Sequence, residues 1–247
     1  MNEDEKKAQQ EAMTRIMNEV KQLLSDRGPE AAVEFIEGQD DLGKTVNTYN
    51  NLIFELYNKE KNLKWLVPVA NAGITFCLGK SKELASQNAE LSTKLKSVAK
   101  ALSFNLASFT WPGWDEKGIV ITQADLDAGL EAAKLNLQLV EELGADPGQM
   151  SNSHWSVGAH YLARKTPADF DKAKKSFESA LDYGKQAGSR ESELMNAGYI
   201  VITRVLAGED ARSDLDDVVK ELNDLGTGDA KFFAKQIEDV LEVFSGS

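Results

Sequence analysis

Apolar residues recur every three or four positions along most of the chain, the spacing of amphipathic helices. In the first half, this pattern predicts helices over residues 5–26 and 44–59, a short helix after Pro29 and one long helix over 81–108. The apolar segment 62–79 contains Pro68, which we expect to start or kink a helix. In the second half, the predicted helices cover residues 123–144, 150–165, 168–187, 190–206, 211–225 and 229–244. The pattern therefore predicts an all-α fold.

Helix-start signals support these boundaries. Thr122–Asp125 resembles a capping box, Thr166–Asp169 combines a hydroxyl cap with proline at the first helical position, and Ser213–Asp216 is a third such pair. One segment departs from the helical pattern. Tyr199–Val205 is rich in β-branched residues and in isolation resembles a buried strand. We assign it to a helix, since Glu191–Asn196 and the flanking hairpins place it inside one.

The segment Ser151–Gly184 has the composition of a closely packed helical hairpin. Small residues at Gly158 and Ala173 allow two antiparallel helices to approach, and large rings fill the space beside them. The spaced positions are His154, Val157, Gly158 and Tyr161 in the first helix and Ala173, Phe177 and Ala180 in the second. This set resembles the tetratricopeptide pattern, although the turn at Lys165–Pro167 is about three residues longer than is usual in that family.

The neighbouring segments match the same pattern more loosely. Leu194, Ala197, Gly198 and Val201 resemble a first helix, with Val218, Leu222 and Leu225 standing in for its partner, while Ala133, Leu137 and Val140 resemble the second helix of a preceding unit. The resemblance covers about residues 122–226. It implies a right-handed α-solenoid of about ten helices, because a single hairpin cannot bury its own apolar face. The predicted parts are an N-terminal helical region (1–110), a tryptophan-bearing connector (111–121) and the repeats (122–247).

The resemblance also implies a groove lined by the first helices of the repeats. It places on that groove Asn152, Trp155, Ala159 and Leu162, beside Ser192, Met195, Tyr199 and Ile202. These residues lack Lys, Arg and paired Asn, so a clamp for a terminal carboxylate is excluded and an apolar or aromatic partner segment is favoured. The alternative is that Trp155 and Tyr199 pack against the adjacent repeat.

Trp111 and Trp114 flank the turn Pro112-Gly113. Two large aromatic side chains on a loop are costly to expose, so they either form a ligand-contacting lip or plug the junction between the long helix and the repeats.

Charge narrows the classes of partner. The chain carries 28 Lys and Arg against 40 Asp and Glu, a net charge of −12. Nucleic acids and anionic membranes are therefore excluded as expected partners. Cys77 is the only cysteine, and the first 25 residues lack the apolar core of a secretory leader, which favours a cytoplasmic protein unless a leader has been removed. The segment 62–79 is shorter than the roughly 20 residues that cross a bilayer.

Residues Gly38–Thr45 match the phosphate-loop pattern of Gly, any four residues and Gly-Lys-Thr. Asp40 and Asp41 would oppose a polyphosphate, and no alternating strand–helix series surrounds the motif. We expect Asp41 or Thr45 to cap a helix instead. His154 and His160 are six residues apart and point to different sides of a helix, so no metal pair is predicted. The sequence predicts no catalytic residues and no cofactor.

The function predicted from the sequence is a non-catalytic scaffold that presents its groove to a protein or peptide segment, with an undetermined oligomeric state. Two alternatives remain open. The first is a helical protein that binds a small molecule or lipid between segment 62–79 and the tryptophan loop. The second is a phosphate-binding enzyme that uses Gly43-Lys44-Thr45.

Overall fold

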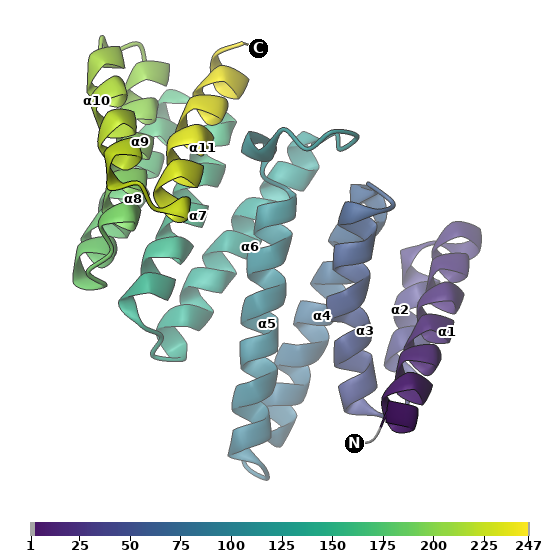
Figure 1. The fold of residues 1–247 in the computed structure, drawn as a ribbon. Helices are drawn as coiled ribbons and strands as arrows, with labels where there is room; N and C mark the ends of the chain where they lie inside the picture. The colour runs from purple at the N-terminus through teal and green to yellow at the C-terminus, as the bar shows by residue number, and fades with distance from the viewer. Residues whose placement is uncertain (1–2, 247) are drawn as a thin grey trace. The chain divides into compact units, whose positions relative to one another are not determined.

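The computed structural model describes residues 3–246, and this part of the chain is all-α, with eleven α-helices, one 3₁₀ turn and no strand (Figure 1). Consecutive helices pack as neighbouring pairs, which confirms the predicted array of helix hairpins. The chain divides into two compact units. The first extends to Leu106 and includes Gly118–Val120, and the second contains Ala107–Lys117 and the chain from Ile121 onward.

The first unit is built from α1 (Glu3–Arg27), α2 (Pro29–Glu37), α3 (Leu42–Asn58), α4 (Leu63–Leu84) and most of α5 (Ala89–Phe109). Tyr49 and the apolar face of α3 are fully buried against α4. Gly73 permits this contact, because a Cβ at that position would lie 2.9 Å from the Tyr49 ring and 3.2 Å from Leu102.

One predicted boundary in this unit is wrong. The helix expected to begin at Ser81 begins at Ala89, because α4 continues to Leu84 and a short turn follows. The Asn88 side chain accepts a hydrogen bond from the Leu91 amide at 3.0 Å and so caps α5. The Ser81 and Ser92 hydroxyls donate to each other's backbone carbonyls at 2.8 Å, which joins the two helices near the turn.

Pro68 lies inside α4 and Cys77 lies on its buried face. Burial raises the pKa of the Cys77 thiol to about 12, so this group stays protonated at neutral pH. Within residues 3–246, every helix is too short or too polar to cross a membrane.

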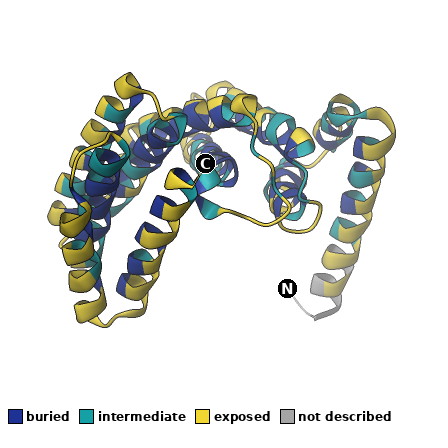
Figure 2. Cartoon of the chain, turned by 90° about the horizontal axis from the view of Figure 1, so that it is seen from above, coloured by how far each residue is buried: buried dark blue, intermediate teal, exposed yellow. Residues whose placement is uncertain are grey.

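The second unit contains η1 (Pro112–Trp114), α6 (Gln123–Glu142), α7 (Pro147–Arg164), α8 (Pro167–Gln186), α9 (Arg190–Leu206), α10 (Arg212–Leu225) and α11 (Gly228–Ser245). Each helix packs on the next, and α11 also packs on α9. The segment Tyr199–Val205 is helical, as we inferred, although its composition favours a strand. Figure 2 shows the buried residues along the faces where neighbouring helices meet.

Local capping explains most helix starts in this unit. Thr122 and Asp125 form the predicted capping box, and Thr166 accepts from the Asp169 amide at 3.2 Å. The third predicted cap is wrong. Ser213 lies inside α10, whose N-cap position is Ala211 and has no side-chain cap.

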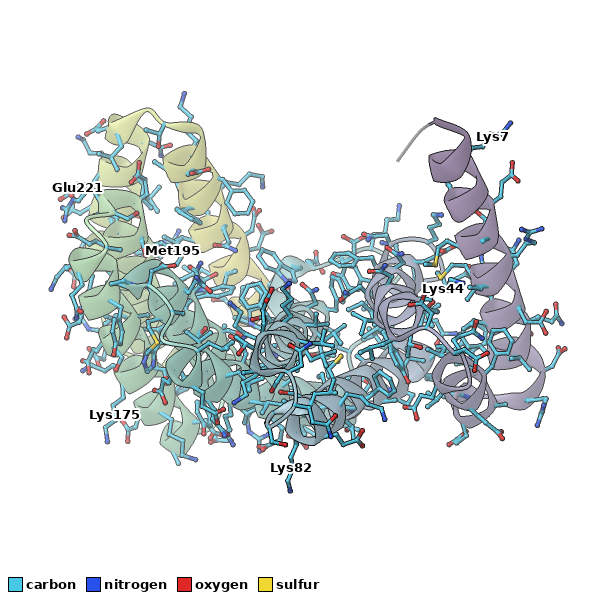
Figure 3. All side chains as sticks on the ribbon, turned by 90° about the horizontal axis from the view of Figure 1, so that it is seen from below. Lys7, Lys44, Lys82, Lys175, Met195 and Glu221 are labelled. Atoms are coloured by element: carbon cyan, nitrogen blue, oxygen red, sulfur yellow. The ribbon has the colours of Figure 1, made fainter. Side chains whose placement is uncertain are left out.

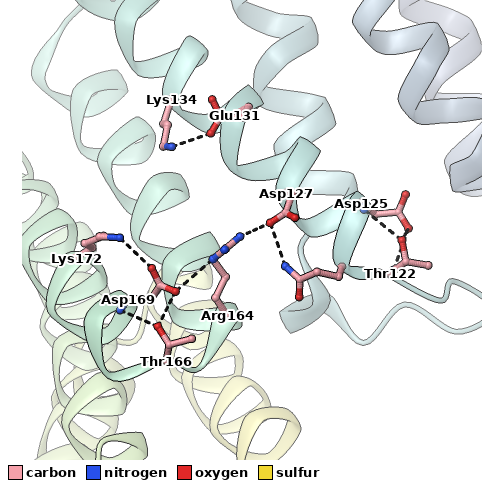
Figure 4. A network of polar contacts seen from close by, with 10 residues as sticks. Thr122, Asp125, Asp127, Glu131, Lys134, Arg164, Thr166, Asp169 and Lys172 are labelled. Atoms are coloured by element: carbon pink, nitrogen blue, oxygen red, sulfur yellow. Dashed lines mark hydrogen bonds and ion pairs between the residues drawn. The ribbon is translucent and has the colours of Figure 1, made fainter.

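The central hairpin of the second unit pairs α7 with α8. A Cβ at Gly158 would lie 2.7 Å from the Phe177 ring, so only glycine permits this approach of the two helices. Polar side-chain contacts at the end of the hairpin link α6 to α7 and α8 (Figure 4). Arg164 on α7 pairs with Asp127 on α6 and with Asp169 on α8, and Lys172 also bonds Asp169 at 3.2 Å.

Candidate functional site

Five of the eight predicted binding residues are buried in the core of the second unit: Trp111, Leu162, Met195, Tyr199 and Ile202. Three of these lie on α9, which is covered by α8, α10 and α11. No partner reaches these five unless the helices separate. Trp114 and Trp155 are half-buried and Asn152 is exposed, and their role in binding stays a prediction.

Trp111 is the centre of an aromatic cluster. Its ring contacts one aromatic residue from each of three helices, with centroid distances of 5.3 Å to Trp155, 6.3 Å to Tyr199 and 6.4 Å to Phe244. Its indole N–H donates to the Ala159 carbonyl at 3.1 Å. With 2% of its surface exposed, Trp111 is a packing residue and does not form a lip. The chain's own tryptophan therefore fills the space between α7, α9 and α11.

The cluster encloses two polar atoms that have no hydrogen-bond partner among the described residues, the Tyr199 hydroxyl and the Trp155 indole nitrogen. Burial raises the pKa of Tyr199 well above its usual value, and the nearby Trp155 N–H acts in the opposite direction. Burial therefore keeps the Tyr199 phenol protonated at neutral pH.

Trp114 is held rigidly at the edge of the same cluster. Its ring stands edge-on to Trp111 at 4.9 Å, and its N–H donates to the Ser108 carbonyl at 3.0 Å. A Cβ at Gly113 would lie within the van der Waals envelope of the Trp111 ring, so glycine is needed for η1 to approach this closely. The half-buried Trp114 ring consequently has a fixed position and no free donor.

A groove of about 850 Å³ opens between η1 and α11, which contact each other. Trp114 and Asp115 contribute from the η1 side. On α11, the lining residues lie at helical spacing along one face, and the C-cap residue Gly246 follows them: Phe232, Lys235, Gln236, Asp239, Glu242 and Val243. Phe232 is 55% exposed, an unusual state for a large aromatic side chain. This groove is the candidate site.

The rim of the groove is acidic. Lys235 is neutralised by Asp239, whose carboxylate it bonds at 2.6 Å. That bond raises the pKa of Lys235, and the nearby Glu238 and Glu242 carboxylates act in the same direction. Asp115 adds a further negative charge from the opposite side. The groove thus combines two accessible aromatic rings with excess negative charge.

Sequence reasoning missed every residue on the α11 face of this groove. The available signal was the pair Phe232-Phe233, because two adjacent residues of an amphipathic helix point about 100° apart and rarely both face the core. In the structure, Phe233 is half-buried against the core while Phe232 faces the groove.

The two histidines lie in different surroundings. His154 stacks on Tyr183 at 5.4 Å, whereas His160 is buried with its Nδ1 at 2.9 Å from the Ser156 carbonyl. Burial lowers the pKa of His160 to about 4. Among residues 3–246, no three His, Cys, Asp or Glu side chains are grouped to hold a metal ion.

The phosphate-loop pattern at Gly38–Thr45 has the geometry of a helix junction. The element before it is helix α2, and Asp41 caps α3 by accepting from the Lys44 amide at 3.1 Å, as the sequence predicted. The Thr45 hydroxyl is buried and bonds the Ile36 and Asp41 carbonyls. Lys44 lies in the first turn of α3 (Figure 3). Neither the Lys44 amide nor the Thr45 hydroxyl is therefore free to bind phosphate or magnesium.

The predicted small-molecule pocket between segment 62–79 and the tryptophan loop is not the groove described above. Residues of that segment, including Leu66, Val69 and Ile74, are buried in the core of the first unit. The described walls of the groove come from η1, α11 and their C-cap residues.

Comparison with known proteins assigns no family. The chain matches no protein-family model. No curated protein is significantly similar to it in sequence.

Proposed function

We propose that the chain is a non-catalytic interaction module, built as a tetratricopeptide-like helical array, that presents the groove between η1 and α11 to a segment of a partner protein. The observation that carries the proposal is the exposed Phe232 ring in the same groove as the rigid Trp114 ring. Accessible aromatic side chains in a preformed depression are typical of protein-binding surfaces.

The dimensions of the groove support a peptide-sized ligand. The lining residues run from Phe232 in α11 to the C-cap residue Gly246, a span of about 21 Å at 1.5 Å per residue. This length suits about four turns of a docked helix or about six extended residues. The rigid fixing of Trp114 reduces the entropy lost on binding.

The resemblance of Ser151–Gly184 to a tetratricopeptide hairpin supports the array, with Gly158 and Phe177 in contact where the pattern expects them. We also propose a cytoplasmic location. The lone, buried Cys77 supports this, because the chain has no second thiol with which to form an internal disulfide.

A photo-crosslinking amino acid at position 232 tests the groove in cells that naturally make the protein. The matched control is the same amino acid at Lys175, which points into solvent from α8 (Figure 3). We expect a discrete adduct from position 232 that is absent from position 175. Identical adduct patterns from both positions, or none from either, would count against the groove.

Binding of a small molecule or lipid is the second candidate, because about 850 Å³ falls within the size range of ligand pockets. Native mass spectrometry of freshly purified protein tests it. A bound mass that is lost in a Phe232→Ala variant would favour this candidate, and a clean unliganded mass would favour the protein partner.

A further inference from the structure

We propose that the groove between η1 and α11 selects a cationic amphipathic segment, in which Lys or Arg residues flank an apolar anchor. This inference rests on the proposed function and names the chemistry of its partner. Three independent features of the groove point to it: its charge, its aromatic rings and its shortage of donors.

The charge of the groove favours a cation. Asp115, Asp239 and Glu242 line it, and Lys235 is the one basic residue among the described lining residues. Lys235 and Asp239 bond each other and offset each other's charge, so Asp115 and Glu242 leave the lining net negative. The surroundings have the same sign, since residues 212–245 contain nine acidic and four basic side chains. A basic segment would therefore be attracted from a distance and retained at the rim.

The aromatic rings of the groove suit the same ligand. Trp114 uses its only N–H on the Ser108 carbonyl, so its remaining capacity is apolar contact and attraction of cations to its ring. Phe232 offers the same capacity from α11, because more than half of its surface is exposed. Apolar atoms of a partner can pack on these two rings while its basic groups lie near the carboxylates.

The hydrogen-bonding groups of the groove are mainly acceptors. Besides the carboxylates, Gln236 has a buried Oε1 without a hydrogen-bond partner among the described residues. A ligand rich in N–H donors, such as Lys or Arg, complements acceptors better than a ligand rich in carboxylates.

Other occupants are disfavoured by the same observations. A second copy of the chain has a net charge of −12 and would bring like charge to an acidic rim. Nucleic acid and anionic lipid are repelled for the same reason. A basic protein segment remains the occupant that fits both the rings and the carboxylates.

Three synthetic peptides test the proposal against the intact protein. Each is about 14 residues long to match the groove, and all share one pattern of Leu and Trp positions. Their polar positions are all Lys, all Gln or all Glu. We expect the Lys peptide to bind about tenfold more tightly than the Gln peptide at low salt, with the Glu peptide weakest. The preference should shrink when the ionic strength rises from about 0.05 to 0.3 M.

Matched variants locate the effect. Asp115→Asn, Asp239→Asn and Glu242→Gln together should weaken the Lys peptide about tenfold and leave the Gln peptide unchanged. The control has the same change of charge on the exposed face of α8, made by Asp171→Asn, Glu178→Gln and Asp182→Asn, and should have little effect. Phe232→Ala should weaken both the Lys and the Gln peptides. Circular dichroism verifies that each variant is folded.

The outcomes separate the two proposals. Equal affinity for the Gln and Lys peptides, with both reduced by Phe232→Ala, would overturn the cationic preference and leave the groove standing. If the groove triple variant and the control triple variant lost equal affinity for the Lys peptide, the preference would be due to the overall charge of the protein. That result would also overturn the proposed cationic preference of the groove. If Phe232→Ala changed no peptide's affinity, the groove itself would be refuted as the binding site.

Discussion

The indole N–H of Trp111 donates to the carbonyl of Ala159 at 3.1 Å, a contact between residues 48 positions apart. Through it the turn that follows α5 is fastened to the middle of α7. The same ring also lies against aromatic residues of α9 and α11. The space that a groove-type partner would fill between these helices is thus occupied by the chain itself.

Replacing Trp111 should be among the most damaging single changes in the second unit. Trp111→Ala removes a buried ring and should lower the free energy of unfolding by about 3–5 kcal/mol. Trp111→Phe keeps most of the volume but loses the hydrogen bond, and should cost about 1–2 kcal/mol. Urea unfolding followed by tryptophan fluorescence measures both, and equal losses from the two variants would contradict this packing.

The hairpin between α7 and α8 should not tolerate a methyl group at its crossing. We expect Gly158→Ala to lower the free energy of unfolding by about 1–3 kcal/mol, because its Cβ would overlap the Phe177 ring. Gly79→Ala is the matched control, since this exposed helical glycine has no atom within 4 Å of the added Cβ. Its expected effect is neutral or a stabilisation of up to about 1 kcal/mol. Thermal unfolding distinguishes the two.

Acid should weaken the second unit through His160. The pKa of this residue is about 4 in the folded protein and about 6.5 in the unfolded chain. Because the unfolded chain then binds more protons, the stability that His160 contributes is present above pH 6.5 and is lost as the pH falls toward 4. Between pH 7 and 5 the expected loss is on the order of 2 kcal/mol.

His160→Gln provides the control for this dependence. The variant should be less stable at neutral pH, yet its stability should fall less between pH 7 and 5 than that of the unaltered protein. Urea titrations at both values measure the difference. Parallel losses in the two proteins would assign the acid sensitivity to other groups.

Asp169 should contribute more to stability than an ordinary surface carboxylate. It lies at the start of α8, bonds the Thr166 hydroxyl at 2.7 Å and pairs with Arg164 and Lys172. Burial alone would raise its pKa, but these three partners outweigh burial and lower it. The contribution is therefore present at neutral pH and is lost as the pH falls through the lowered pKa.

Asp169→Asn should cost about 1–2 kcal/mol. Asp182→Asn removes a charge from the same helix at an exposed position and should change stability by less than about 0.5 kcal/mol. Chemical unfolding at pH 7 compares the two variants. Equal effects would show that the network around Arg164 contributes little to the free energy of unfolding.

Helix content was predictable because its signals are local. Apolar spacing and the caps at Thr122 and Thr166 placed most helices of the second unit within a few residues of their observed ends. The turn between α4 and α5 was missed because it contains neither glycine nor proline, and its cap, Asn88, resembles any polar helical residue. The cap predicted at Ser213 was wrong because a capping sequence forms a cap only where a helix begins, and Ser213 lies inside α10.

The candidate site depended on tertiary packing and was not predictable in the same way. Met195 and Tyr199 fall on the expected face of α9, but both are buried in the core, and the Tyr199 ring is covered by Trp111, Trp155 and Phe177. The pattern of a single helix does not reveal which other helix will cover it. Phe232 is accessible for the complementary reason, because it lies on the side of α11 that lines the groove.

The long sequence separation between Trp111 and its partners predicts that their contacts form late in folding. Pairs such as α7 and α8 join residues close in sequence, so they can form early and at little entropic cost. The aromatic cluster needs the end of α5 and the last helix at the same time, and we expect it to close late. A partly folded second unit would then have an open aromatic groove. The groove would close when Trp111 packs into it at the end of folding.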